Sequence, residues 1–326
     1  MEKWMSVITS TFNKSRYLDL LLAGFTLQDD SYFEIVIVDD GSTDNTEEIV
    51  SKYTDQLNIQ YIYQANTGVP GARNKALESA NGQYIVIIDD DRIPSPSFIS
   101  EHKKALSQDR PIVSIGAQYR LLTAYSNQIP LPFEDWMRLF DKYPELTETT
   151  GEIQFVTAAD IIHNFDGVVD KFTLGLYDPG QLMRLVQQYG DQLDHYHFGW
   201  SKSYGGNMAF DRSKLTSPLA YDPGFTGYAV EDVDISYQLY LQNYKFVYTK
   251  TACNYHQEHP RNERERQFQF RNIKHLLNKY NNLDMHLHEL EIHGEADFQC
   301  VNFVMDLLVK DPSIVEKMKE FAARKR

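Results

Sequence analysis

The chain has 326 residues, of which 42% are hydrophobic and 13% aromatic, so it can bury a sizeable core and is not a disordered chain. Its 46 acidic side chains outnumber its 32 basic ones, and the net charge of −14 argues against a protein that coats duplex nucleic acid. Two cysteines are too few for a disulfide scaffold or a four-cysteine zinc site. We expect a soluble, cytoplasmic protein, because the first residues do not resemble a signal peptide and no apolar stretch reaches the roughly 18 residues that span a bilayer.

The first ninety residues alternate short apolar runs with amphipathic segments. Strands are predicted over residues 5–9, 34–38, 59–63 and 84–88, and helices over 18–25, after residue 44 and over 71–80. We interpret Asp44 as the N-cap of the second helix, and Asn81 with Gly82 as the stop of the third. Alternating strands and helices predict βαβ units, and therefore an α/β fold with a mostly parallel sheet.

Acidic residues follow two strands of this predicted sheet. The second strand ends in Asp39 and Asp40, and the fourth ends in the triple aspartate 89–91. Both clusters lie at the carboxyl edge of the strands, where such sheets bind their ligands. Three adjacent carboxylates repel one another, so the sequence favours a divalent cation held by one or two of them together with ligand phosphates. The alternative is a solvated turn with Arg92 as a neighbour.

Other nucleotide and metal motifs are absent from the sequence. No G-x-G-x-x-G follows the first strand, and no P-loop sequence occurs. The segment after Asp40 fails as an EF-hand, because Asn45 and Ser51 replace the required Gly and Glu. The histidines at 286, 288 and 293 match no ligand spacing, and we expect them on a solvated helix face.

The second half carries weaker periodicity. Region 118–199 is punctuated by prolines and rich in aromatic residues, and we interpret it as an insertion that faces the acceptor. A helix is predicted to start near Glu231, and a strand is predicted over 245–248. Further helices are predicted over 268–280 and 298–308, with a last short helix from residue 312. That last helix has an apolar stripe with basic residues around it, but it is short and Glu316 and Glu320 dilute its charge, so we favour a docked terminal helix over the alternative, a contact with a membrane surface.

Four runs in the first hundred residues resemble a family 2 glycosyltransferase of the GT-A fold. They are residues 6–14 (SVITSTFNK), 38–44 (VDDGSTD), 71–74 (GARN) and 88–91 (IDDD), in the family's order. The resemblance implies that Ser10, Thr11 and Asp40 grip the nucleotide base of the donor. It also implies that Arg73 lies near the base or the diphosphate.

The triple aspartate resembles the DxD motif of this family. In that comparison Asp91 is the metal ligand, and Asp89 or Asp90 contacts the ribose. Three aspartates allow two registers of the motif, so the sequence leaves the choice between Asp89 and Asp90 open.

Residues 204–210 (YGGNMAF) and 231–234 (EDVD) resemble the galactosyltransferase-type C-terminal module of metal-dependent inverting transferases. The resemblance implies that Asp232 is the general base, which accepts a hydroxyl proton as the new bond forms. The other residues implied in donor or acceptor contacts are Glu231, Gly206, Asn207 and Trp200.

A histidine after the strand at 245–248 resembles the third metal ligand of the same module. His256 is the first candidate and His259 the second, and a neutral imidazole readily joins carboxylates around Mn²⁺ or Mg²⁺.

Together these features predict an inverting, metal-dependent glycosyltransferase that moves a sugar from a nucleotide sugar, a UDP-sugar, to an acceptor hydroxyl in glycan or glycoconjugate synthesis. A GT-A domain is expected over residues 1–265, with a nucleotide-binding half (1–117) and an acceptor half (118–265), followed by a helical extension over 266–326. The alternatives are a nucleotidyltransferase, which releases pyrophosphate, and a non-catalytic nucleotide-sugar-binding scaffold. The donor sugar, the acceptor and the oligomeric state are left open; the acceptor classes are glycans, lipid-linked sugars and other hydroxyl compounds.

Overall fold

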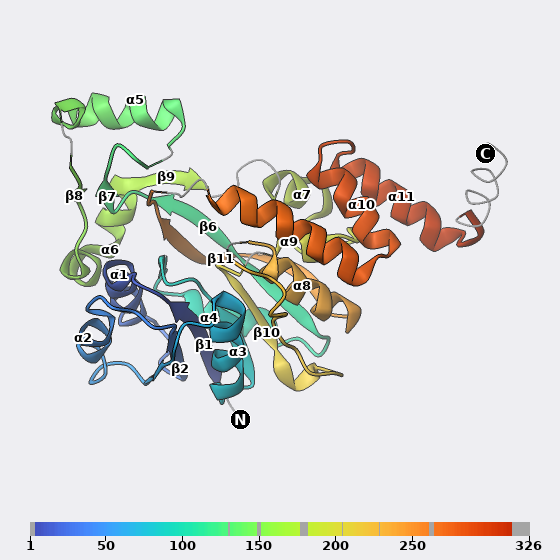
Figure 1. The fold of residues 1–326 in the computed structure, drawn as a ribbon, viewed down its shortest axis with the longest axis horizontal. Coiled ribbons are helices and arrows are strands. Elements are labelled where there is room, and N and C mark those ends of the chain that lie inside the picture. The colour runs from blue at the N-terminus through green and yellow to red at the C-terminus, as the bar shows by residue number, and fades with distance from the viewer. Residues whose placement is uncertain are drawn as a thin grey trace.

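A central sheet organises the chain. The computed structural model describes residues 4–129, 131–148, 151–176, 182–203, 205–227, 229–260 and 264–314. The sheet contains nine strands, which are β1 (Met5–Thr11), β2 (Phe33–Asp39), β3 (Ile59–Tyr63), β4 (Tyr84–Ile87), β5 (Arg92–Pro94), β6 (Ile112–Leu121), β9 (Thr173–Leu176), β10 (Met208–Asp211) and β11 (Lys245–Gln257). Their order is β3-β2-β1-β4-β10-β6-β11-β5, and β9 pairs with β6. Figure 1 shows helices on both sides of the sheet.

The helices come in two groups along the chain. The helices before residue 150 are α1 (Ser15–Phe25), α2 (Thr46–Ser51), α3 (Val69–Ser79), α4 (Phe98–Leu106) and α5 (Phe133–Lys142). The later ones are α6 (Ala158–Phe172), α7 (Leu182–Tyr189), α8 (Glu231–Leu241), α9 (Arg264–Tyr280), α10 (Leu283–Ile292) and α11 (Phe298–Lys310). Short 3-10 turns lie at Pro144–Glu148, Gly199–Lys202 and Arg212–Lys214, and the strands β7 (Ala124–Tyr125) and β8 (Ile153–Gln154) form a small second sheet.

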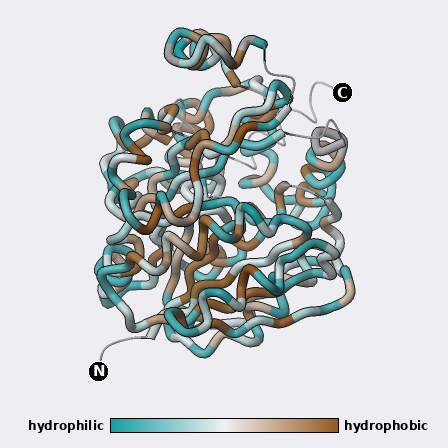
Figure 2. The backbone as a smooth tube through the Cα atoms, turned by 90° about the vertical axis from the view of Figure 1, so that its left-hand side faces the viewer, coloured by the Kyte–Doolittle hydropathy of each residue, from teal (hydrophilic) through white to brown (hydrophobic). Residues whose placement is uncertain are grey.

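The continuous apolar runs form strands that are buried on both faces. In β2, Ile35 and Ile37 enter one core cluster, whereas Val36 and Val38 enter the cluster on the other face. Successive side chains of a strand point to opposite faces, so each face of this strand requires apolar residues. Figure 2 shows the result, with hydrophobic segments gathered in the middle of the molecule. The predicted α/β fold is confirmed.

The sheet was predicted to be mostly parallel, but in the structure it is mixed. Strands β1, β2, β3 and β4 pair in parallel. Strand β10 then enters antiparallel between β4 and β6, and β5 and β9 also pair antiparallel. The long strand β11 runs parallel to β6 as far as Gln257, well beyond the predicted 245–248. This extension carries the end of β11 to the carboxyl edge of the sheet.

Two local predictions about helix ends are wrong. Helix α3 ends at Ser79 with Ala80 in an extended conformation, so Gly82 is not its left-handed stop. Gly82 is needed for packing instead, because a Cβ there would lie 2.5 Å from the backbone nitrogen of Ser6. The N-cap position of α2 is Asn45 rather than Asp44, although Asp44 still accepts a hydrogen bond from the Thr46 amide at 3.2 Å.

The region 118–199 contains regular structure that its sequence pattern does not show. Helix α5, β7 and β8 surround a small apolar cluster that includes Leu122, Tyr125, Leu139 and Leu146. We call this part, residues 122–155, the α5 module; Figure 1 shows α5 standing apart from the central sheet. Whether it faces an acceptor stays a prediction.

The C-terminal helices share a core with the sheet. Leu276 of α9, Met285 of α10 and Phe298 of α11 belong to the same apolar cluster as Trp200 and β10. Among the described helices, none is both long and apolar enough to pass through a bilayer. The predicted last helix falls mainly on residues 315–326, which lie outside the described residues, and the predicted boundary at 265 stays a prediction.

Candidate active site

The triple aspartate lies directly after β4, at the carboxyl edge of the sheet. The ammonium of Lys14 contacts two of its members, with Nζ 3.2 Å from Oδ1 of Asp90 and 2.8 Å from Oδ2 of Asp91. Both carboxylates are buried. Burial raises the pKa of Asp90 to about 6, with Lys14 opposing the shift and Asp91 adding to it. Burial also acts to raise the pKa of Asp91, but Lys14 and His256 hold it well below its usual value.

Strand β11 brings two histidines to Asp91. The Gln257 amide donates a hydrogen bond to the carbonyl of Asp91 at 2.9 Å, which ties the end of β11 to the acidic turn. The Nε2 atoms of His256 and His259 lie 3.9 and 3.2 Å from the two carboxylate oxygens of Asp91. One ligand atom from each of the three residues falls within 4.8 Å of the others. The structure therefore joins both candidate histidines to the predicted metal aspartate.

Both rings are held by their other nitrogen. His256 Nδ1 lies 3.2 Å from a carboxylate oxygen of Glu258, and His259 Nδ1 lies 2.9 Å from the carbonyl of Pro260. Both partners can only accept a hydrogen bond, so Nδ1 carries the proton in each ring. In His256, whose pKa burial lowers, the lone pair of Nε2 then faces Asp91. In His259, Nε2 also donates a hydrogen bond to Asp91 at 3.2 Å. Burial acts to lower the pKa of His259 but this hydrogen bond raises it, so His259 has to lose its Nε2 proton before it can bind a metal.

This donor set fits a divalent cation. Asp91 Oδ1 is buried and accepts no hydrogen bond within the described part of the chain, so the site contains an unsatisfied acceptor. Burial lowers the pKa of His256, which favours the neutral ring that a metal requires. Imidazole nitrogen together with carboxylate oxygen suits Mn²⁺ and similar ions, and Asp91, His256 and His259 are the residues that would hold it.

Arg73 joins the triple aspartate to the acidic start of α8. Its guanidinium lies 2.6 Å from Asp89, 3.3 Å from Glu231 and in close contact with Asp232. Burial opposes the charge of Arg73, but Asp232 and its other anionic neighbours raise the pKa of Arg73 well above its ordinary value. One buried cation thus brings together acids that are far apart in the sequence.

The carboxyl groups at the start of α8 are unusually basic. Burial, followed by the charge of Asp232, raises the pKa of Glu231 to about 8, although Arg73 opposes this shift. Burial and Asp89 also raise the pKa of Asp232, again against the effect of Arg73. The Asp232 side chain stays 19% exposed, so a ligand can reach it. A raised pKa suits a carboxylate that has to accept a proton.

Two glycines pack closely against this acidic group. A Cβ at Gly205 would lie 2.2 Å from Oδ1 of Asp232, and a Cβ at Gly206 would lie 2.7 Å from the guanidinium of Arg92. Only glycine fits these positions without displacing the side chains. Gly205 and Gly206 therefore allow the backbone to pack directly against the side chains of Asp232 and Arg92.

The residues implied in base binding lie at the neighbouring strand ends. Ser10 and Thr11 end β1, and the Asp40 amide donates to the carbonyl of Thr11 at 2.9 Å. The Asp40 carboxylate already accepts from the amides of Thr67 and Gly68, at 2.9 and 2.8 Å. In this state Asp40 braces the loop before α3.

Two of the implied sugar contacts need correction. Trp200 is fully buried and packs on Tyr237 and His288, with ring centroids 4.7 and 4.9 Å apart. The Asn207 side chain is also fully buried, and its amide donates to the carbonyls of Ala117 and Ala252. Both side chains belong to the core rather than to the surface that receives a sugar. The same packing buries His288, contrary to the predicted solvated face.

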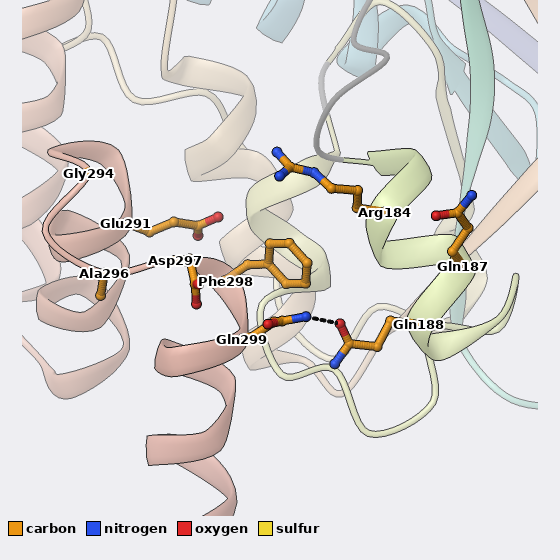
Figure 3. Close-up of a pocket in the computed structure, with 9 residues that line it drawn as sticks. All are labelled: Arg184, Gln187, Gln188, Glu291, Gly294, Ala296, Asp297, Phe298 and Gln299. Atoms are coloured by element: carbon orange, nitrogen blue, oxygen red, sulfur yellow. Dashed lines mark hydrogen bonds between the residues drawn. The ribbon is translucent and has the colours of Figure 1, made fainter.

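A hollow of about 550 Å³ lies away from these acids, between α7 and the turn from α10 to α11. Figure 3 shows Arg184 and Glu291 on its two sides and the hydrogen bond that joins Gln299 to Gln188. None of the acidic or histidine side chains around Asp91 and Asp232 lines it. This hollow is therefore separate from the candidate active site.

Sequence reasoning missed three charged residues of the site. Lys14, Arg92 and Glu258 were not predicted, although Lys14 and Arg92 belong to or follow runs that carry the family resemblance. The sequence signal that could have indicated them is that all three lie near the ends of strands. The acidic Asp234 of the E-D-x-D element has another role, because it is buried against Lys279 and Tyr280 of α9.

Comparisons with known proteins agree with the fold. Residues 6–164 match the family model described as Glycosyl transferase family 2. The chain is 26% identical over 294 residues to the Uncharacterized glycosyltransferase YfnE of Bacillus subtilis (strain 168), covering 86% of this chain and 72% of that one. It is 28% identical over 268 residues to the Chondroitin synthase of Escherichia coli, covering 80% of this chain but only 36% of the synthase.

A solved structure supports the fold over nearly the whole chain. The mannosyltransferase PcManGT from Pyrobaculum calidifontis, in complex with GDP-Man and Mn²⁺, superposes with a TM-score of 0.50 at 15% identity. The match covers 99% of this chain and 80% of that one. The chain is therefore a glycosyltransferase that carries a family 2 domain in a GT-A fold.

Proposed function

We propose that this glycosyltransferase is a metal-dependent, inverting enzyme that transfers a sugar from a nucleotide sugar, a UDP-sugar, to an acceptor hydroxyl. The observation that carries the proposal is the placement of two acidic groups at one sheet edge. Asp91 and two histidines would hold the cation, and Arg73 connects the adjacent Asp89 to Asp232. A diphosphate leaving group and an acceptor hydroxyl need a cation site and a base in this arrangement.

In the proposed reaction Asp232 takes the proton of the acceptor hydroxyl. The hydroxyl oxygen forms a bond to the anomeric carbon while the bond from that carbon to the diphosphate oxygen breaks, and nucleoside diphosphate leaves. Attack from the face opposite the leaving group inverts the anomeric configuration, so an α-linked donor gives a β-linked product. When bound, Mn²⁺ or Mg²⁺ supplies positive charge that stabilises the leaving diphosphate.

The remaining site residues hold the donor in this proposal. Ser10, Thr11 and Asp40, at neighbouring strand ends, would bind the base, and Asp89 or Asp90 would bind the ribose. Asp40 has to exchange part of its loop contacts for the base.

Acceptor contacts are assigned to the exposed side of the start of α8. In this proposal Glu231, which shares Arg73 with Asp232, and the backbone at Gly206, which packs on Arg92, contact the acceptor or the donor sugar. The proposed acceptor is a glycan, a lipid-linked sugar or another hydroxyl compound, and the relative named Chondroitin synthase favours a glycan.

A donor panel tests the proposal. We expect UDP or a UDP-sugar to raise the melting temperature only when Mn²⁺ or Mg²⁺ is present, because binding to the folded state raises its stability. Asp91→Asn should abolish the rise in melting temperature that metal and nucleotide give together. Asp29→Asn, which changes an aspartate in the loop before β2, should keep that rise. Release of UDP in a donor-hydrolysis assay supports transfer chemistry. Release of pyrophosphate, or binding without any turnover, contradicts it.

A further inference from the structure

A chain of charged side chains connects the α5 module to His256. Asp135 of α5 accepts from Arg120 of β6 at 2.8 Å, and Nε of Arg120 donates to Glu258 at 3.1 Å. The same oxygen of Glu258 accepts from Nδ1 of His256 at 3.2 Å. All four side chains are largely buried, with Arg120 the most exposed at 15% and Glu258 the least at 3%. The contacts next to His256 are therefore shielded from water, where charge-assisted hydrogen bonds are strongest.

The chemistry of Glu258 fixes which nitrogen of His256 carries the proton. A carboxylate can only accept, so the nitrogen that faces Glu258 is the protonated one and Nε2 is left with its lone pair. That lone pair points to the side of Asp91, whose Oδ1 lies 3.9 Å away. Arg120 limits the rotation of Glu258, since both Arg120 and His256 bind its Oε1.

We propose that Glu258, held by Arg120 and Asp135, is a positioning residue that sets the tautomer and ring orientation of His256 for binding a divalent metal. Partners of this kind orient metal-ligating histidines, and their loss typically lowers metal affinity by about 10- to 100-fold. The inference rests on the proposed function, because it takes His256 as a ligand. His259 provides the internal contrast, since the Pro260 carbonyl holds its Nδ1 and no side-chain substitution removes that partner.

The alternative is that Glu258 only stabilises the fold as a buried ion-pair partner. The two roles differ in what they predict for the ring and the metal. A purely stabilising Glu258 affects the melting temperature but neither the His256 tautomer nor the affinity for Mn²⁺. A matched control is Glu34, which is also buried and accepts from Ser6 and Asn81 at the opposite end of the strands.

The experiment compares Glu258→Ala, Glu258→Asp and Glu258→Gln with Glu34→Ala. In the metal-free full chain, ¹⁵N NMR of the histidine rings reports the tautomer, and titration with Mn²⁺ alone, followed by the EPR signal of free Mn²⁺, reports affinity. We expect the Nδ1–H tautomer of His256 in the unmodified protein and a mixture in Glu258→Ala. Mn²⁺ affinity should fall about 10- to 100-fold in Glu258→Ala. It should fall less in Glu258→Asp, whose carboxylate is one methylene shorter, and least in Glu258→Gln, which keeps an oxygen acceptor.

Each result has a defined meaning. Wild-type Mn²⁺ affinity and an unchanged tautomer in Glu258→Ala overturn the inference, as does an equal loss of affinity in Glu34→Ala. If Glu258→Ala does not fold, Glu258→Asp decides, because it keeps the charge and the Arg120 partner; affinity equal to that of the unmodified protein then overturns the inference. If the unmodified protein binds no Mn²⁺ although His256 shows the Nδ1–H tautomer, the metal part of the proposed function fails instead.

Discussion

Replacing Gly205 by alanine should disable the proposed base without unfolding the protein. The added Cβ would lie 2.2 Å from Oδ1, 2.4 Å from Cγ and 2.5 Å from Oδ2 of Asp232, so every rotation of the carboxylate meets it. Ordinary contact begins at 3.4 Å, and the carboxylate therefore has to retreat by 3.4 − 2.2 = 1.2 Å. A displacement of about 1 Å at a reacting group can lower the rate on the order of 100-fold, or about 2.7 kcal/mol in the barrier.

The assay is UDP release from the preferred donor, with binding of the donor measured in parallel. We expect kcat to fall about 100-fold while nucleotide still raises the melting temperature. Gly205 does not have a positive φ, so the substitution itself adds no backbone strain. The reduced entropy of the unfolded chain even offsets part of the clash, by about 0.4–1 kcal/mol. The urea midpoint should therefore stay close to that of the unmodified protein, although kcat falls about 100-fold.

Gly151→Ala is the matched control, because a Cβ at Gly151 meets nothing within 4 Å. It should leave kcat unchanged and raise the stability slightly, by about 0.4–1 kcal/mol, because no clash opposes the loss of unfolded-chain entropy. Wild-type turnover in a folded Gly205→Ala variant would show that the observed position of Asp232 is not the catalytic one, and the base assignment would then have to be abandoned.

Three further substitutions test the charges of the site and of the core. Asp232→Asn should lower UDP release by about 10²- to 10⁴-fold with donor binding intact, as expected for loss of a general base; unchanged turnover in a kinetic assay removes the assignment. Glu231 has its pKa raised by burial and by Asp232 to about 8, so the folded state holds a proton that the unfolded state has lost, and stability falls as the pH rises from about 4.5 to about 8. The urea midpoint of metal-free Glu231→Gln, relative to that of the unmodified protein, should therefore rise as the pH rises across this range. A difference between the two midpoints that does not change with pH contradicts the assignment. Lys202→Met leaves the buried carboxylate of Glu291 without its 2.5 Å partner and should destabilise the fold by about 3–5 kcal/mol, measured by urea unfolding. Lys202→Met/Glu291→Leu should recover most of that loss, and equal stabilities of the single and double variants exclude the explanation.

The first half of the fold was predictable because its strands are buried on both faces. The run 34–38 is continuous and apolar for that reason, and the aspartates that follow it mark the carboxyl edge. The order of β10 and β11 was not predictable, since their pairing depends on partners more than ninety residues earlier in the chain and leaves no local pattern. The extension of β11 to Gln257 went unrecognised because a change of register after Thr249 interrupts its alternation.

Site residues that belong to motifs could be proposed from the sequence. The role of residues that depends on whether their side chains are buried could not. Asp91 and Asp232 could be named from their motifs, but the sequence offered no way to choose between His256 and His259, which the structure places at the same carboxylate. Trp200 was misplaced because an aromatic residue near a glycine-rich loop suits both a sugar contact and a core. Only the covering rings of Tyr237 and His288 distinguish the two.

The position of Lys14 has a consequence for how the proposed site would acquire a metal. Burial alone would lower the pKa of Lys14, but Asp90 and Asp91 raise it above its ordinary value, so the ammonium remains charged between them. The chain thus carries an internal counter-ion for its own acidic turn, and it can fold before any metal is bound. A divalent ion that binds Asp91 has to exchange with this ammonium, which lowers the net gain from binding and favours a site that releases its metal readily. If the proposed site binds a metal, folding and metal loading are therefore separate equilibria.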